Sequence, residues 1–140
     1  MREGWYEDNY LVLFEDRAES LAELYGLSQA LPGYRLVGLL SWADFLVQDS
    51  RGAQYTVPTV PMLLQKLKPC HMTAAPKALR PDDRISGKVK WYLQPVVFGG
   101  DPNRGDNLAW VTLEEHTELV RWWNEKYQEV QAARGGQPAA

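Results

Sequence analysis

Apolar side chains recur at steps of three and four residues in the first part of the chain, which is the spacing of one face of a helix. This stripe consists of Leu11, Phe14, Ala18, Leu21 and Tyr25. It predicts an N-terminal helix that begins near Asp8 or Asn9, and Gly26 suits its left-handed end. A short strand over residues 10–14, followed by a shorter helix, is the alternative that the same pattern leaves open.

The helical spacing returns more clearly near the other end of the chain. Thr112, followed three residues later by Glu115, is a capping box, in which each side chain accepts a hydrogen bond from the other residue's backbone N–H. The apolar stripe that follows comprises Leu113, His116, Val120, Trp123, Tyr127 and Val130. We therefore predict a closing amphipathic helix with a buried stripe, and a flexible tail over residues 132–140.

Between these helices the pattern changes to short runs of β-forming residues. The runs 34–40, 44–49 and 54–57 predict a meander of three antiparallel strands, with Gly52 as the left-handed turn residue. Met62 to Leu67 can form a short helix before Pro69.

The second half of the chain adds a loop and two further strands. Prolines at 69, 76 and 81 indicate a long loop over residues 69–86. Residues 88–98, interrupted at Pro95, and residues 108–111 predict the strands. The whole pattern predicts one α+β domain over residues 1–131, with N-terminal helices, a mostly antiparallel sheet of about five strands and a closing helix.

Composition narrows the class of protein. Of the 140 residues, 45% are hydrophobic and 24% are charged, as in ordinary globular domains, and the net charge is −3. The longest apolar runs are far shorter than the roughly 20 residues of a membrane-spanning helix. The N-terminal segment lacks the apolar core of a signal peptide, and Cys70 has no second cysteine as a partner. We therefore expect a cytoplasmic protein with no membrane partner.

Few side chains are suited to covalent chemistry. Cys70 and His71 are neighbours, and neighbours in an extended chain point to opposite faces, so their adjacency argues against a dyad. His116 lies on the apolar stripe, where a histidine is more often a core residue than a base. Residues 101–107 resemble the start of an EF-hand loop, but Asp106 replaces the required glycine and Thr112 the required glutamate. We predict no enzyme activity, no metal site and no cofactor.

Two stretches together resemble the SUKH superfamily, which is named partly for a yeast cell-wall assembly regulator. The first is the entry "helix, Gly, Leu-Pro, aromatic", here Leu24 to Tyr34. The second resembles a bacterial branch and comprises Pro95 to Pro102, then Trp110, then Glu115 to Asn124. The resemblance covers about half of the chain. At Val37-Gly38-Leu39-Leu40 the chain departs from the Asn-Gly or Gly-rich step that the family often shows after the aromatic residue.

The resemblance implies a non-enzymatic, immunity-type protein that neutralises a bacterial toxin by direct complex formation. No catalytic residue follows from it. Binding residues concentrate at strand ends and turns, so we expect a partner-binding surface formed by Trp42, Asp44, Asp49, Asp101, Asn103 and Arg104. Aromatic side chains that remain exposed, with Trp42 and Trp122 as candidates, would serve as anchors.

Two other hypotheses remain at this point. The first is a small hydrolase or transferase that uses His116 with an acid of the 101–106 loop. The second is a regulatory scaffold domain whose basic 66–90 segment, with seven lysines and arginines against two aspartates, docks an acidic partner. Basic residues are not interleaved with the aromatic residues along the chain, so nucleic acid is not the expected partner. The sequence leaves the oligomeric state open.

Overall fold

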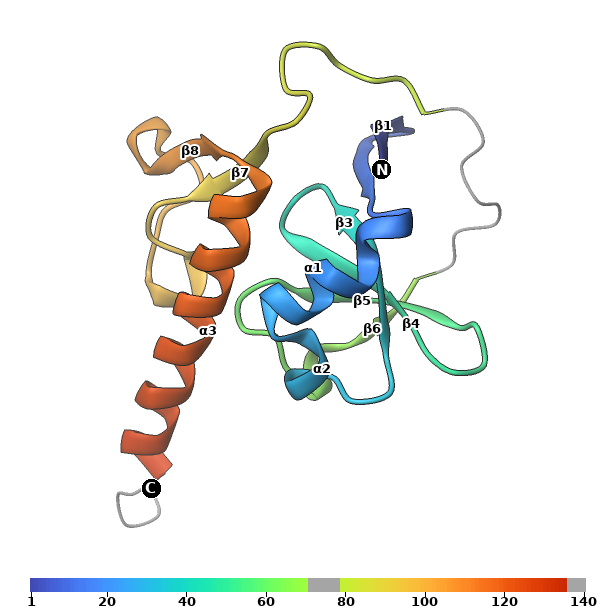
Figure 1. Cartoon of the computed structure of the whole chain (residues 1–140). Helices are drawn as coiled ribbons and strands as arrows, with labels where there is room; N and C mark the ends of the chain where they lie inside the picture. The colour runs from blue at the N-terminus through green and yellow to red at the C-terminus, as the bar shows by residue number, and fades with distance from the viewer. Residues whose placement is uncertain (71–78, 136–140) are drawn as a thin grey trace.

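A computed structural model of the chain describes residues 1–70 and 79–135. In this part of the chain it contains a six-stranded antiparallel sheet and a two-stranded sheet, short helices near the N-terminus and a long C-terminal helix (Figure 1). The predicted α+β class is confirmed. The principal sheet has six strands, where the sequence predicted about five.

The six strands follow one another in chain order, so each pairs with its neighbour in sequence. They are β1 (Arg2–Tyr6), β2 (Asn9–Leu13), β3 (Arg35–Leu40), β4 (Asp44–Gln48), β5 (Gln54–Pro58) and β6 (Lys68–Pro69). The predicted meander corresponds to β3, β4 and β5. Gly52 has a positive φ of 87° in the turn before β5, as predicted.

The N-terminal segment is a β-hairpin, so the prediction of a helix from Asp8 or Asn9 is wrong. β1 pairs with β2, and η1 (Glu15–Arg17) and α1 (Ala18–Tyr25) follow, which confirms the alternative of a strand and a shorter helix. Residues 10–14 are all buried, and a strand buried on both faces shows no alternation that would reveal it. Gly26 ends α1 with a φ of 77°, as predicted.

The main core lies where α1 and α2 (Leu27–Ala30) pack together with the sheet. α1 contacts β3 on one side and the long helix α3 (Leu113–Gly135) on the other. The largest core side chains include Tyr10, Phe14, Tyr25, Leu39 and Phe45, each with at most 1% of its surface exposed. Burial of each stabilises the fold by about 1.5–3 kcal/mol.

Gly38 of β3 lies directly against the backbone of β2. A Cβ atom on Gly38 would lie 2.0 Å from the carbonyl oxygen of Val12, so only glycine fits without a backbone shift. The register between β3 and β4 also shifts beside this residue, between Leu36 and Gly38. Gly38 therefore allows the backbone of β3 to lie close to that of β2.

The two-stranded sheet consists of β7 (Val89–Tyr92) and β8 (Leu108–Val111) and packs against α3. β8 has the predicted bounds. The predicted strand over 88–98 is wrong beyond Tyr92, because Pro95 precedes a single turn, η3 (Val96–Phe98). A second such turn, η4 (Gly105–Asn107), leads into β8.

The predicted capping box of α3 is confirmed. The Thr112 N–H donates to the Glu115 carboxylate at 3.0 Å, and the Glu115 N–H donates to the Thr112 hydroxyl at 3.1 Å. The two bonds satisfy backbone donors that a helix leaves free at its start, which fixes where α3 begins.

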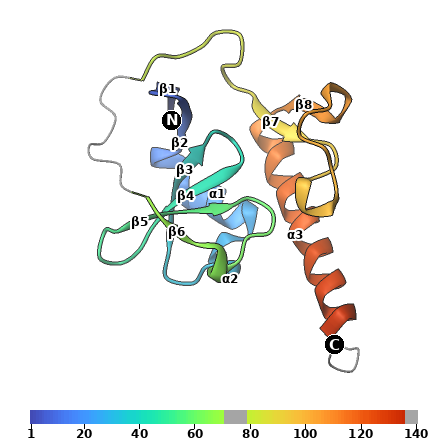
Figure 2. The same cartoon turned by 180° about the vertical axis from the view of Figure 1, so that it is seen from behind.

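The apolar stripe of α3 is fully buried only in its first half. Leu113, His116 and Val120 are buried, whereas Trp123, Tyr127 and Val130 are half-buried, so the predicted burial of the last three is wrong. The C-terminal half of α3 extends past α1 and the β7–β8 hairpin, which leaves it only partly covered (Figures 1 and 2). Residues 132–135 continue the helix, and the predicted tail over 136–140 lies outside the described residues.

The predicted long loop over 69–86 is structured at both of its ends. The turn η2 (Leu64–Lys66) lies within the short helix predicted before it, and β6 pairs with β5. Further on, Arg80 forms an isolated bridge with Trp5 on the outer side of β1. Residues 71–78, with His71, lie outside the described residues.

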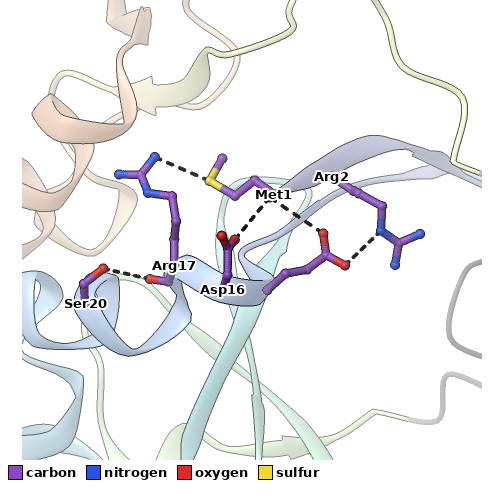
Figure 3. Close-up of polar contacts among 6 residues, drawn as sticks. Met1, Arg2, Asp16, Arg17 and Ser20 are labelled. Carbon is purple, nitrogen blue, oxygen red and sulfur yellow. Dashed lines mark hydrogen bonds and ion pairs between the residues drawn. The ribbon is translucent and has the colours of Figure 1, made fainter.

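The start of β1 is held against η1 by a group of exposed polar contacts (Figure 3). The Met1 amino group lies 3.7 Å from the Glu15 carboxylate and 3.6 Å from that of Asp16, and Arg2 donates to Glu15 at 3.0 Å. Arg17 lies 3.8 Å from Glu114 of α3. Exposed pairs of this kind contribute about 0–1 kcal/mol each, so they position the strand more than they stabilise it.

Candidate functional site: the cleft beside strand β7

Strand β7 leaves the outer half of its backbone groups unpaired. The residue pairs of the hairpin are Val89–Val111, Lys90–Trp110, Trp91–Ala109 and Tyr92–Leu108, and the Leu93 N–H donates to the Asn107 carbonyl at 2.8 Å. Hydrogen-bonded and non-hydrogen-bonded pairs alternate in an antiparallel ladder, so Trp91 bonds to β8 whereas the backbone groups of Lys90 and Tyr92 point away from it. Within residues 1–70 and 79–135 these outward groups have no backbone hydrogen-bond partner.

The unpaired edge of β7 faces the body of the protein. In both views β7 lies between β8 and the six-stranded sheet (Figures 1 and 2). The outer edges of that sheet are protected: Trp5 and Arg80 exchange hydrogen bonds of 2.9 and 3.3 Å beside β1, and β6 ends at Pro69, which has no N–H. Among the described residues the outer edge of β8 is unpaired as well, but it faces away from the sheet (Figures 1 and 2).

A cleft of about 200 Å³ lies beside this edge, and we call it the β7 cleft. Four segments line it: residues 41–44, 58–60, 90–92 and 95–97. The six-stranded sheet thus contributes the β3–β4 turn and the end of β5, and the hairpin contributes β7 and the turn after it. Most of the lining side chains are apolar, and a largely apolar cleft with a few polar groups is typical of a binding site.

Trp42 lines the β7 cleft and belongs to an aromatic cluster. Its ring stacks on Tyr10 with centroids 5.0 Å apart, and it meets Trp110 of β8 edge-on at 5.2 Å and Trp5 at 6.3 Å. Trp42 is only 9% exposed, so it braces the hairpin against the sheet and is not the exposed anchor that the sequence suggested. Ser41 and Trp42 both have positive φ, 48° and 62°, a rare backbone state that is often found at functional sites.

Asp44 is the acidic group of the β7 cleft. It is half-buried at the start of β4, and no described residue donates a hydrogen bond to its carboxylate. Burial raises the pKa of the Asp44 carboxyl, and the positive charge of Lys68 partly opposes this shift. A half-buried carboxylate without a donor is costly, and a partner that supplies an N–H or a cation would relieve that cost.

A strip of exposed and half-buried apolar side chains continues from the cleft onto α3. Val96 and Val97 line the cleft and are 53% and 46% exposed. The neighbouring Phe98 ring contacts Trp123 of α3 at 4.8 Å, and Trp123 contacts Trp122, which is 55% exposed, also at 4.8 Å. We call these five residues the apolar strip. Large exposed aromatic side chains in a continuous patch are typical of interaction surfaces.

Three of the predicted partner-binding residues lie on the exposed loop between η3 and β8. Asp101 and Arg104 line a polar hollow of about 320 Å³, and Asn103 is exposed beside them. Asp101 accepts the Asn103 N–H at 2.9 Å, and Arg104 forms a two-point pair with Asp106 at 3.0 and 2.7 Å. These bonds shape the loop, and they leave the three side chains at the surface.

Asp49 is separated from the other predicted residues. Asp44 begins β4, and Asp49 follows its last residue, at the other end of the strand. The Asp49 carboxylate accepts hydrogen bonds from the N–H groups of Arg51 and Ala53, both at 2.9 Å. This pattern builds the β4–β5 turn. The structure therefore brings Trp42 and Asp44 together in the β7 cleft, groups Asp101, Asn103 and Arg104 on the loop, and places Asp49 apart from both.

His116 is sealed inside the core. It has no exposed surface, its Nδ1 lies 2.7 Å from the Tyr25 hydroxyl, and its ring lies between those of Tyr25 and Trp91 at 5.5 and 5.4 Å. Burial lowers the pKa of the His116 imidazole to about 3, so the ring is neutral at physiological pH. No acid of the 101–106 loop contacts it within the described chain.

The described residues show neither a metal-binding group nor a membrane-spanning helix. Residues 1–70 and 79–135 hold no group of three or more His, Cys, Asp or Glu side chains placed to bind a metal ion. The helices formed by the same residues are too short or too polar to cross a bilayer.

Comparisons with family models, with curated proteins and with solved structures gave no match to this chain.

The sequence did not reveal the exposed part of the site. Val96 and Val97 were placed in a strand that was expected to continue to Phe98, and a strand of the sheet would have covered them. Pro95 was the available signal, since proline cannot continue a central ladder. Trp122 was recognised as a candidate for exposure, because it lies beside the stripe of α3 and not on it.

Proposed function

We propose that the protein is a non-enzymatic, immunity-type binding protein that neutralises a bacterial toxin by forming a direct complex with it. The apolar strip beside the β7 cleft is the observation that carries the binding function. The class of partner rests on two resemblances: residues 24–34 resemble the SUKH superfamily, and residues 95–102, 110 and 115–124 resemble a bacterial branch of it.

The strip supports a protein partner because it joins apolar anchors to polar groups within one surface. Val96, Val97 and Trp122 would lose water on contact with a partner, and tryptophan is among the commonest energetic anchors of interfaces. Asp101, Asn103 and Arg104 lie on the next loop and supply the polar margin that specific interfaces have.

The hydrolase alternative lacks comparable support. His116 is fully buried and is held by Tyr25, and no acid of the 101–106 loop contacts it among the described residues. The scaffold alternative retains one favourable observation, because Lys66, Lys68, Arg80, Arg84 and Lys88 are all exposed. Binding through these charges would weaken strongly with added salt, whereas binding through the apolar strip would not.

The test is binding to the toxin domain encoded in the neighbouring reading frame. We expect a one-to-one complex that buries roughly 1,200–2,000 Å² in total, and protection of cells that express both proteins. Calorimetry with the Trp122→Ala variant should show a loss of about 2 kcal/mol or more, which is roughly a 30-fold weaker affinity.

Leu24→Ala is the matched control, because Leu24 is a similarly exposed apolar residue, on α1 and away from the strip. It should change the affinity by less than about 0.5 kcal/mol. The absence of both binding and protection would contradict the proposed function, and equal losses for the two variants would contradict the role of the strip.

A further inference from the structure

We infer that the β7 cleft captures a short extended segment of the partner, which adds to the outer edge of β7 as a further strand. This inference rests on the proposed function, since it describes how the same surface takes hold of a protein partner. This mode of binding differs from contact through the apolar strip alone, because main-chain hydrogen bonds would supply much of the recognition.

The backbone of β7 is already prepared for such a strand. The N–H and C=O groups of Lys90 and Tyr92 point away from β8 and bond to no other described residue. Each residue offers one donor and one acceptor, and their spacing of two residues is the repeat of a strand. A neighbouring strand would satisfy all four groups at once, which an irregular loop or a helix surface would not do.

The side chains around the cleft indicate the chemistry of the segment. Apolar walls formed by Val60, Val96 and Val97 suit an apolar side chain, and the cleft volume of about 200 Å³ suits a segment of only a few residues. Asp44 adds a carboxylate with no hydrogen-bond donor of its own among the described residues. The segment is therefore extended, about three residues long, and carries an apolar residue and a basic residue such as lysine or arginine.

The cleft also explains why β7 is preferred to β8. The outer edge of β8 has unpaired groups at Leu108 and Trp110, but neither residue lines the cleft. The side chains of a strand added to the β8 edge would have no cleft in which to bury apolar surface. Edge pairing without such burial is weak in water.

Lys90→Pro tests the inference on the protein itself. Proline removes the outward N–H of Lys90, leaves the bonds of Trp91 to β8 in place, and suits an edge strand. Lys90→Ala is the matched control, because it removes the same side chain and keeps the N–H. We expect Lys90→Pro to bind the neighbouring toxin domain about tenfold more weakly, or worse, than Lys90→Ala does.

A second measurement does not depend on how the proline variant folds. Linear twelve-residue peptides are selected from a display library on the wild-type protein, and the tightest binder is resynthesised with one backbone nitrogen methylated at a time. If the peptide adds to β7 as a strand, methylation of every second backbone nitrogen should abolish binding. Methylation of the nitrogens between them should leave the affinity nearly unchanged. Asp44→Asn should weaken binding of a peptide that contains lysine or arginine, and should not weaken binding of the same peptide with that residue changed to norleucine.

The outcomes separate the two proposals. If the toxin domain binds wild type, Lys90→Ala and a folded Lys90→Pro equally well, the edge strand is contradicted while the binding function stands. If no toxin binds but peptides show the alternating pattern, the proposed function fails and the edge strand stands. Selection of no peptide, or selection of peptides whose binding ignores backbone methylation, overturns the edge strand.

Discussion

Trp91 lies between two regions of the molecule that differ in whether their polar groups can be reached by a partner. On one side its ring packs against His116, which the core seals together with Tyr25. On the other side its backbone runs along the β7 cleft, between two residues whose outward N–H and C=O groups are unpaired. The sequence drew attention to His116, yet the available groups are those of the main chain on either side of Trp91.

The comparison shows why a histidine in a sequence is a weak sign of chemistry in this fold. His116 is neutral and inaccessible, and its Nδ1 is bonded to Tyr25, whereas its buried Nε2 has no partner among the described residues. We therefore expect His116 to contribute to stability and not to chemistry. The polar groups of the cleft contribute little to stability, because among the described residues its carboxylate has no donor and the outer edge of β7 has no partner. Sites that bind are often less stable than the core that supports them.

Removal of His116 should have the largest effect. His116→Ala would leave a cavity and an unpaired Tyr25 hydroxyl in the core, and we expect a loss of about 3–5 kcal/mol in the free energy of unfolding. Urea denaturation followed by fluorescence measures this quantity. A loss below about 1 kcal/mol would show that the Tyr25–His116 region is not the sealed core described above.

The pH dependence of stability should be the next largest effect. Burial lowers the pKa of His116 to about 3, whereas the unfolded chain has the ordinary value near 6.5. Below pH 6.5 the unfolded state takes up a proton that the folded state excludes, so stability falls as the pH drops toward 3. We expect His116 to account for a loss of about 2–3 kcal/mol between pH 6.5 and pH 4.5.

His116→Gln removes this titration and keeps a hydrogen-bonding group beside Tyr25. The difference between the wild-type and variant curves of unfolding free energy against pH isolates the contribution of His116. Parallel curves over this range would contradict a sealed, neutral imidazole.

Loss of the capping box of α3, the helix that carries His116, should have a moderate effect on the free energy of unfolding. Thr112→Ala removes the hydroxyl that caps the Glu115 N–H, and we expect it to lower the free energy of unfolding by about 1 kcal/mol. Glu118→Ala is the control, because Glu118 is exposed on the same helix. Equal effects in thermal unfolding would mean that the cap does not fix the start of α3.

The smallest effect should come from the cleft and should have the opposite sign. Burial raises the pKa of Asp44, so its ionised form destabilises the folded state at neutral pH. We expect Asp44→Asn to increase the free energy of unfolding at pH 7 by less than about 1 kcal/mol, and the gain to vanish in acid, where Asp44 is protonated. A clear loss of stability at pH 7 would assign Asp44 to the structure and not to the binding site.

Local patterns in the sequence predicted the elements whose signals are local. The capping box at Thr112, the strand over 108–111, the meander and the left-handed Gly26 and Gly52 all depend on residues close together in the chain. The N-terminal hairpin was missed because residues 10–14 are buried on both faces and so mimic a helical stripe.

The site was less predictable because it depends on which elements meet. Trp42 was expected at a surface, but Tyr10, Trp5 and Trp110 pack against it from three different strands. Trp123 was expected in the core, but it lies at the edge of the core, half-buried against Phe98 and Trp122. Neither outcome is encoded in spacing along the chain, since each follows from the packing of distant segments.

Amide hydrogen exchange along β7 tests the central claim most directly. The Lys90 and Tyr92 amides should exchange quickly in the free protein, while the Trp91 amide, bonded to β8, is protected. Addition of the toxin domain should slow exchange at Lys90 and Tyr92 and leave that at Leu108 and Trp110 unchanged. Protection of Lys90 and Tyr92 already in the free protein, or new protection confined to β8, would contradict a β7 edge that awaits a partner.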